Sequence, residues 1–102
     1  LNSCHKNAAK YLNGYFGSIF TIEFSTKDNC FKFLDNLKLI RRATNLHDNK
    51  TLAIHPASTI FCEYSKEKKK ELGVNDNMVR IATGIENVED LCEDILKSLE
   101  VL

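Results

Sequence analysis

Arg80 is the residue of this sequence whose type and setting are best suited to chemistry. It lies within the run MVRIA at residues 78–82, which predicts a β-strand. An arginine in such a strand must reach solvent or find an anion, because its guanidinium is a planar fork of donors that matches a carboxylate. The residues alone therefore leave two interpretations open: an edge-exposed or salt-bridged arginine, and an anion-binding site.

Other nucleophiles, bases and glycines form weaker patterns. His55 and Cys62 flank a short loop as a base and a nucleophile could, yet no oxyanion hole or orienting third partner is recognisable nearby, which favours structural roles. Cys4 and His5 are adjacent, whereas catalytic pairs of this kind are built from distant positions. The sequence GYFG at residues 14–17 has the glycine spacing of a nucleic-acid clamp but leads into a predicted strand, so a clamp is not expected.

Charge is balanced along the chain. Fourteen lysines and arginines oppose fourteen aspartates and glutamates, and the two signs are interspersed, so no basic field would attract nucleic acid or an anionic membrane. The longest charged run, KEKKKE at residues 66–71, is interpreted as the solvated face of a helix. A soluble partner or a small molecule fits this composition better.

The sequence indicates neither membrane insertion nor a metal site. No apolar stretch approaches the roughly 20 residues that span a bilayer, and the N-terminus lacks the apolar core of a signal peptide, which predicts a cytoplasmic location. The cysteines have no paired spacing, which argues against zinc ligation and against a disulfide framework. They are expected to be thiols that are mostly buried: Cys4, Cys30, Cys62 and Cys92.

Hydrophobic spacing and turn residues predict the elements that would position a site at Arg80. Ser65 and Asn87 are suited to cap helices, and Gly73 is suited to end one. The apolar face that follows Asn87 recurs at three- and four-residue spacing and is the strongest helix signal in the chain. The predicted order is helix 7–12, strand 18–24, a helix whose apolar stripe spans residues 30–37, strands 39–46 and 51–54, helix 66–72, strand 78–83 and a helix from residue 88 onward.

This order predicts one α+β domain over residues 1–102, with a small, largely antiparallel four-stranded sheet covered by helices. The length allows one packed core and leaves little room for a second lobe. The same order suits a ferredoxin-like fold. The pattern by itself therefore leaves three functions open: part of an enzyme, a stand-alone regulatory module that binds an amino acid, and a domain that packs on partner subunits.

Several stretches, taken in order, resemble the C-terminal region of the Cys/Met metabolism family of pyridoxal-phosphate (PLP) enzymes. Two are specific in combination, namely a His-Pro-Ala-Ser element that begins at His55 and an Arg-x-x-x-Gly-Ile-Glu element that begins at Arg80. The resemblance covers nearly the whole chain. Its stretches are GSIFT at 17–21, FLDNLKLI at 33–40, TLAIHPAST at 51–59, RIATGIE at 80–86 and VEDL at 88–91.

The resemblance implies a fold-type I PLP transferase, in which a large domain holds the cofactor on a lysine and a small C-terminal domain closes over an amino-acid substrate. This chain corresponds to the small domain, so the large PLP-binding domain is the expected partner. Lys27, in the sequence STK at residues 25–27, lacks the downstream glycine, histidine and aspartate of the family's cofactor lysine and is not expected to carry PLP. The isolated chain is therefore expected to be catalytically inactive.

The implied site residues are Arg80, which matches the arginine that binds the substrate α-carboxylate, and Thr51, which stands where relatives usually have a supporting serine. A bidentate guanidinium grip would orient the amino acid over the cofactor plane. Lysine could not reproduce that planar fork.

Within the family, the sequence is more similar to O-acetylhomoserine sulfhydrylases than to cystathionine γ-synthases, cystathionine γ-lyases or methionine γ-lyases. The similarity rests on Asn45 and Leu46 followed by Asp48, and on the form of residues 54–59. The implied reaction replaces acetate on O-acetylhomoserine by sulfide or a thiol, giving homocysteine or methionine. One departure is His47, which stands where a glycine is common.

The chain begins at Leu1 with residues that suit the end of a helix, which is expected of a piece of a longer protein. A piece separated from its large domain would expose apolar surface. Through that surface the isolated chain could form a homodimer.

Overall fold

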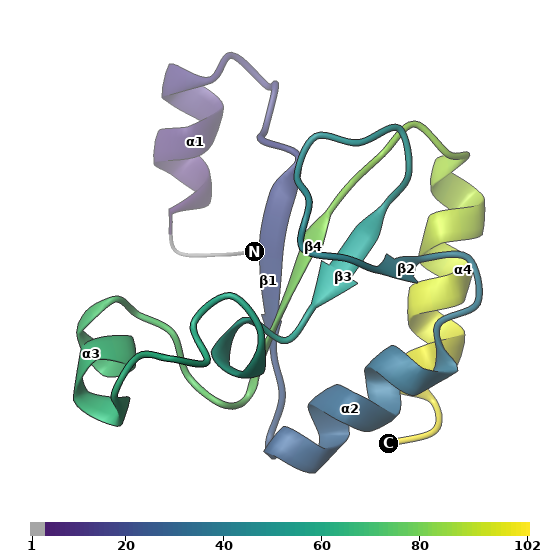
Figure 1. Cartoon of the computed structure of the whole chain (residues 1–102). Helices are drawn as coiled ribbons and strands as arrows, with labels where there is room; N and C mark the ends of the chain where they lie inside the picture. Colours follow the sequence, from purple (N-terminus) through teal and green to yellow (C-terminus); the bar gives the residue numbers. More distant parts are fainter. Residues whose placement is uncertain (1–3) are drawn as a thin grey trace.

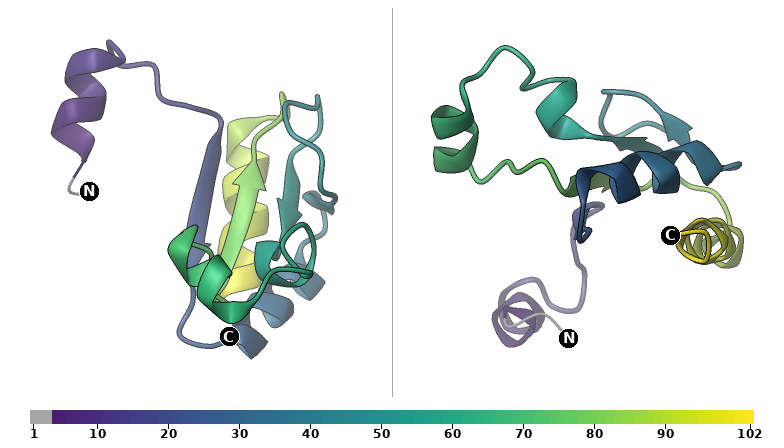
Figure 2. Two further views of the ribbon diagram at one scale, coloured as in Figure 1. Left: turned by 60° about the vertical axis from the view of Figure 1, so that its left-hand side comes forward. Right: turned by 90° about the horizontal axis from the view of Figure 1, so that it is seen from below.

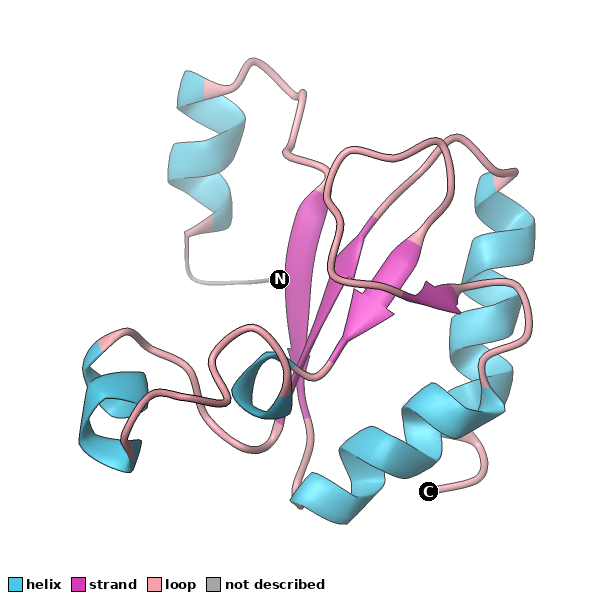
Figure 3. Ribbon diagram, in the orientation of Figure 1, coloured by secondary structure: helices cyan, strands magenta, loops and turns pink. Residues whose placement is uncertain are grey.

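The computed structural model describes residues 4–102. Their arrangement is α+β, as predicted, with the strands grouped in one sheet and the helices around it (Figure 3). The elements in chain order are α1 (His5–Tyr11), β1 (Ile19–Glu23), α2 (Lys27–Asn36), β2 (Arg41–Arg42), β3 (Leu52–Ile54), the short 3-10 helix η1 (Pro56–Ser58), α3 (Lys66–Glu71), β4 (Met78–Ala82) and α4 (Val88–Leu99) (Figure 1).

The four strands lie in the order β1-β4-β3-β2. β4 is antiparallel to both of its neighbours, β1 and β3, while β2 runs parallel to β3. The sheet is therefore mixed, whereas a largely antiparallel one was predicted. The physical reason is that the chain between β2 and β3 makes a wide loop over residues 43–51 instead of a tight hairpin, so both strands run in the same direction.

The predicted strand 39–46 shortens to the two residues Arg41–Arg42. The carboxylate of Asp94, a buried residue of α4, accepts hydrogen bonds from the successive backbone amides of residues 38–40, at 2.9, 3.0 and 2.9 Å. These amides point at the helix and are not available to a neighbouring strand. The contact joins α4 to the turn that precedes β2.

One face of the sheet carries the core. Alternation along β4 directs Val79 and Ile81 toward α2 and α4, which lie on the same side of the sheet (Figure 2). Arg80 projects from the opposite face. The core cluster consists of Cys30, Phe33, Leu34, Ile40, Ala53, Val79, Ile81 and Leu91.

The caps predicted at Ser65 and Asn87, and the helix end predicted at Gly73, are confirmed. The side chains of Thr26, Ser65 and Asn87 each accept a hydrogen bond from a first-turn amide, at 3.2, 3.1 and 2.9 Å, and so begin α2, α3 and α4. Gly73 ends α3 with a φ of 77°, in the left-handed region that glycine enters without a steric penalty.

The expectation that the cysteines are mostly buried is wrong. Cys30 is buried, and its burial raises the pKa of its thiol, but Cys4, Cys62 and Cys92 are exposed. No disulfide links cysteines within residues 4–102. Over the same residues, no helix combines the length and apolar character needed to cross a membrane, and no three histidine, cysteine or acidic side chains are grouped to hold a metal ion.

Candidate functional site

Arg80 lies in the middle of β4, opposite Thr21 of β1 and Ile54 of β3. Its side chain is half-buried, and its Nη2 donates a hydrogen bond to the carbonyl oxygen of Thr44 at 3.1 Å. Its Nε is buried and has no hydrogen-bond partner. Within residues 4–102 no ion pair includes this arginine. Of the five N–H donors of a guanidinium, only the one that binds Thr44 has a protein acceptor within residues 4–102.

Residues 43–50 form the loop that brings the Thr44 carbonyl to Arg80 (Figure 1). His47 turns this loop with a φ of 56°, in the left-handed region that favours glycine. This backbone conformation suits the glycine that the resemblance implies at this position. Histidine is among the residues that enter this region more readily than most, so the loop keeps its path.

Thr51 ends the loop and is almost fully buried, with 1% of its surface exposed. Its backbone amide donates to Oε2 of Glu86 and its hydroxyl donates to Oε1, each at 2.7 Å. The hydroxyl oxygen also accepts a hydrogen bond from the Gly84 amide at 2.8 Å. The Thr51 hydroxyl is therefore occupied by protein partners, and its contact with a substrate carboxylate stays a prediction.

Gly84 lets the turn after β4 approach the end of the loop 43–50 closely. A Cβ atom there would lie 2.2 Å from the carbonyl oxygen of Asn49 and 2.6 Å from the carbonyl carbon of Lys50, so no other residue fits without moving the backbone. The next amide, that of Ile85, donates to the same Asn49 oxygen at 2.9 Å. The glycine of the Arg-x-x-x-Gly-Ile-Glu element is thus required by this contact.

Glu86 is a carboxylate held in its ionised form. Partial burial acts to raise its pKa, but hydrogen bonds from the Thr51 amide, the Thr51 hydroxyl and its own amide outweigh burial and lower it. A group whose pKa is lower in the folded state stabilises the fold above its unfolded pKa. That stabilisation is lost as pH falls through the folded pKa.

We therefore expect the free energy of unfolding to fall as pH drops below the ordinary range of a glutamate carboxyl, and to fall less steeply in Glu86→Gln. Urea unfolding followed by circular dichroism, over roughly pH 3 to 7, measures both slopes. Glu89→Gln, which removes an exposed carboxylate of α4, is the matched control and should change the slope less than Glu86→Gln does. Equal slopes in Glu86→Gln and the unchanged chain would contradict this assignment.

His55 has a structural role. It is 2% exposed, and both ring nitrogens have partners: Nε2 with the carbonyl oxygen of Asp76 and Nδ1 with Oγ of Ser58, each at 2.7 Å. Because a carbonyl only accepts, Nε2 donates the hydrogen bond to Asp76. Cys62 therefore has no ring nitrogen left to act as its base.

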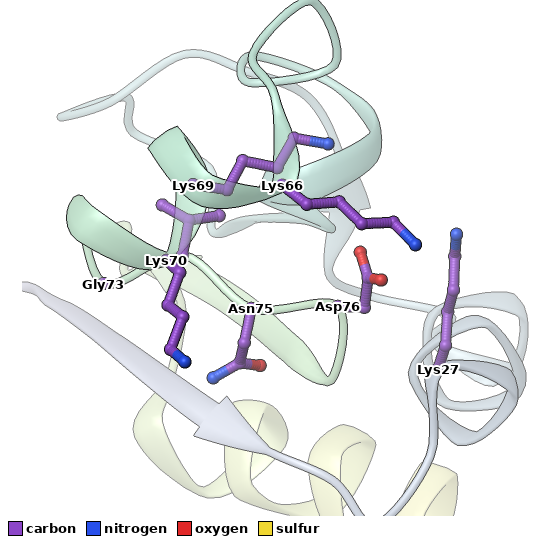
Figure 4. A pocket seen from close by; sticks show the side chains of 8 residues that line it. Lys27, Lys66, Lys69, Lys70, Gly73, Asn75 and Asp76 are labelled. Carbon is purple, nitrogen blue, oxygen red and sulfur yellow. The ribbon is translucent and has the colours of Figure 1, made fainter.

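Lysines line a separate, open pocket of about 600 Å³ (Figure 4). None of its lining residues is aromatic, so nothing there could stack on the pyridine ring of PLP. Lys27 is an exposed residue at the first position of α2, directly after the cap Thr26. This pocket does not fit the cofactor. The residues that line it are Lys27, Lys66, Lys69, Lys70, Gly73, Val74, Asn75 and Asp76.

The structure thus places Thr51 directly before β3, three residues from Ile54, which lies opposite Arg80, and it leaves Lys27 outside the site. It adds two carboxylates whose roles the sequence did not reveal. Glu86 belongs to the Arg-x-x-x-Gly-Ile-Glu element, which could have marked it, whereas Asp94 has no recognisable signal on its helix.

Comparison with known proteins gives consistent matches. The model of the family described as "Cys/Met metabolism PLP-dependent enzyme" matches residues 2–100. O-acetyl-L-homoserine sulfhydrylase 1 of Thermus thermophilus is 40% identical over 96 residues, which are 93% of this chain and 23% of that protein. An L-methionine gamma-lyase of Fusobacterium nucleatum subsp. polymorphum is 38% identical over 97 residues, which are 94% of this chain and 24% of the lyase. The chain spans about a quarter of the length of these relatives.

Solved structures have the same fold. A putative O-acetylhomoserine (thiol)-lyase from Campylobacter jejuni, crystallised with N'-pyridoxyl-lysine-5'-monophosphate, superposes with a TM-score of 0.87 at 30% identity, covering 97% of this chain and 24% of that one. The O-acetylhomoserine sulfhydrylase of Wolinella succinogenes superposes with a TM-score of 0.67 at 44% identity, covering 84% of this chain and 22% of that one.

Proposed function

The chain belongs to the Cys/Met metabolism PLP-dependent enzyme family, and from this premise we propose that it is the C-terminal, substrate-closing domain of a longer O-acetylhomoserine sulfhydrylase-like enzyme. The observation that carries the proposal is Arg80. Its guanidinium has one protein acceptor, an unpartnered Nε and no ion-pair partner within residues 4–102, on the sheet face that α2 and α4 leave uncovered.

Arg80 would bind the α-carboxylate of an amino-acid substrate through charge-assisted, bidentate hydrogen bonds. β4 is the second strand from one edge of the sheet and is paired on both sides, so the base of the side chain is held rigidly. A fixed carboxylate orients the reacting carbon atoms and reduces the entropy lost on reaching the transition state.

The PLP of the family would be held by the remainder of the longer protein, because the lysine pocket of this chain does not fit it. α1 and the loop after it are a suitable surface for packing against that remainder. α1 contributes no buried residue and stands apart from the sheet (Figure 2). Its end and the loop expose apolar side chains, Tyr11, Leu12, Tyr15 and Phe16. In an isolated chain the same surface could pair with a second copy.

The methionine gamma-lyase relative defines the second candidate, a parent enzyme that eliminates the γ-substituent instead of replacing it. Both reactions would use Arg80 in the same way. A product assay separates them, because replacement on O-acetylhomoserine gives homocysteine, whereas elimination does not depend on sulfide or a thiol.

Titration of the 102-residue chain with PLP tests whether it carries a cofactor lysine. We expect no stoichiometric absorption band of a lysine Schiff base, and no homocysteine from O-acetylhomoserine and sulfide. A stoichiometric band that Lys27→Ala abolishes and Lys97→Ala does not, together with turnover, would refute the assignment of this chain to the small domain.

An activity test needs the whole catalytic machinery. We therefore suggest a chimeric enzyme in which residues 1–102 of this chain replace the matching 23% of the Thermus thermophilus sulfhydrylase. Turnover of O-acetylhomoserine and sulfide by the chimeric enzyme would support the proposed function. Loss of turnover, when the unmodified relative is active and the chimeric enzyme is folded, would count against it.

A further inference from the structure

We propose that Glu86 is a positioning residue for Arg80. It would act through Thr51 and the loop 43–50, whose Thr44 carbonyl binds the guanidinium. The inference rests on the proposed function. Glu86 makes no hydrogen bond or ion pair with the guanidinium, and both of its carboxylate oxygens bind Thr51 instead. It acts on the loop 43–50, whose Thr44 carbonyl group binds the guanidinium.

The first step is the link between two segments that are distant in sequence. Both carboxylate oxygens of Glu86 are bound by Thr51, through its amide and its hydroxyl, each at 2.7 Å. Such a two-point contact fixes the rotation of Thr51 as well as its distance from the turn after β4. The end of the loop 43–50 is therefore attached to the turn that follows the strand carrying Arg80.

The second step is the precision of that attachment. The Gly84 amide donates to the Thr51 hydroxyl at 2.8 Å, and the Ile85 amide donates to the Asn49 carbonyl at 2.9 Å. The backbones are so close that a Cβ at Gly84 would lie 2.2 Å from the Asn49 oxygen. Loop and turn therefore move together, and Glu86 provides the charged bonds between them.

The third step leads to Arg80. At the other end of the loop, the Thr44 carbonyl accepts a hydrogen bond from Nη2 at 3.1 Å, as one oxygen of a bound carboxylate would. The position of the loop thus decides whether the Thr44 carbonyl occupies an N–H donor of the guanidinium. Loss of the Glu86 contact would let the loop shift and change the orientation of Arg80 toward a substrate carboxylate.

A double-mutant cycle in the chimeric enzyme tests the inference, with KM for O-acetylhomoserine and kcat measured separately. We expect Glu86→Gln to raise KM about tenfold when Arg80 is present, and less than about twofold in an Arg80→Lys background, because the two residues act through one contact. Equal factors in both backgrounds would mean that Glu86 acts independently of Arg80 and would overturn the inference. If Arg80→Lys alone changes nothing, the proposed function fails instead.

Variants of Thr51 and a matched acid complete the test. Thr51→Val removes the hydroxyl that binds Oε1 of Glu86 and should reproduce the rise in KM of Glu86→Gln, whereas Thr51→Ser keeps this hydroxyl and should raise KM less than Thr51→Val does. Glu89→Gln, at an exposed position on α4, should leave KM unchanged.

A second measurement does not need turnover. In the 102-residue chain, the NMR resonance of Arg80 Nε reports the surroundings of the guanidinium. It should shift in Glu86→Gln and not in Glu89→Gln, and an unshifted resonance in both would overturn the inference.

Discussion

Arg80→Ala in the chimeric enzyme is expected to lower kcat/KM for O-acetylhomoserine by roughly a thousandfold, equivalent to about 4 kcal/mol of lost transition-state binding. The expectation follows from a guanidinium that is half-buried and has a single protein acceptor, so a substrate carboxylate would supply its counter-charge. Arg80→Lys should lose about a hundredfold, because an ammonium keeps the charge but not the planar fork. Steady-state kinetics at varied O-acetylhomoserine and saturating sulfide would give both values.

Arg42→Ala is the matched control for this experiment. Arg42 lies in β2 and pairs with Asp35, and both side chains are largely exposed. Surface pairs of this kind contribute little to stability, so kcat/KM should stay within about twofold of the unchanged enzyme. Near-normal kcat/KM in Arg80→Ala would mean that this arginine has a structural role and that the carboxylate is bound elsewhere.

Asp94→Ala is expected to destabilise the chain by about 3 kcal/mol, a large part of the stability of a domain of this size. Its two carboxylate oxygens accept hydrogen bonds from the amides of residues 38–40, and Asp94 is 8% exposed. Alanine would leave these amides without a partner, in a place where water has limited access. The turn before β2 would also lose its attachment to α4.

Asp94→Asn should be destabilising by about 2 kcal/mol, because it keeps the volume but presents an amide nitrogen to at least one amide donor. Asp90→Ala, at an exposed position on the same helix, should cost less than about 1 kcal/mol. Urea unfolding followed by circular dichroism compares the three variants under one set of conditions. A loss in Asp94→Ala no greater than that in Asp90→Ala would refute the role assigned to this carboxylate.

Local structure was readable from the sequence, because the interactions that decide it span few residues. Ser65 binds an amide three positions ahead, Asn87 binds amides two and three positions ahead, and Gly73 ends a helix through its own φ. The alternation along residues 78–82 likewise identified Arg80 as the charged exception in a buried strand. These features depend on residue types and short spacings alone.

The surroundings of Arg80 were decided by tertiary structure. Its acceptor, the Thr44 carbonyl, is 36 residues away along the chain, and the two residues of the Glu86–Thr51 contact are 35 apart. A backbone carbonyl has no residue type to recognise, and a glutamate in a turn is indistinguishable from a solvated one until its partner is known.

The same distinction explains the sheet. Apolar runs predicted four strands, but the direction of β2 and its length of two residues depend on the path of the loop 43–51 and on Asp94, which contacts residues 38–40 across 54 to 56 residues. Pairing direction is set by how a connection crosses the molecule, and hydrophobic periodicity does not contain that information. The sequence by itself determined most of the elements and which arginine stands out. Only the folded chain decided which carboxylate holds the loop beside it, because that contact joins residues that are 35 positions apart in the sequence.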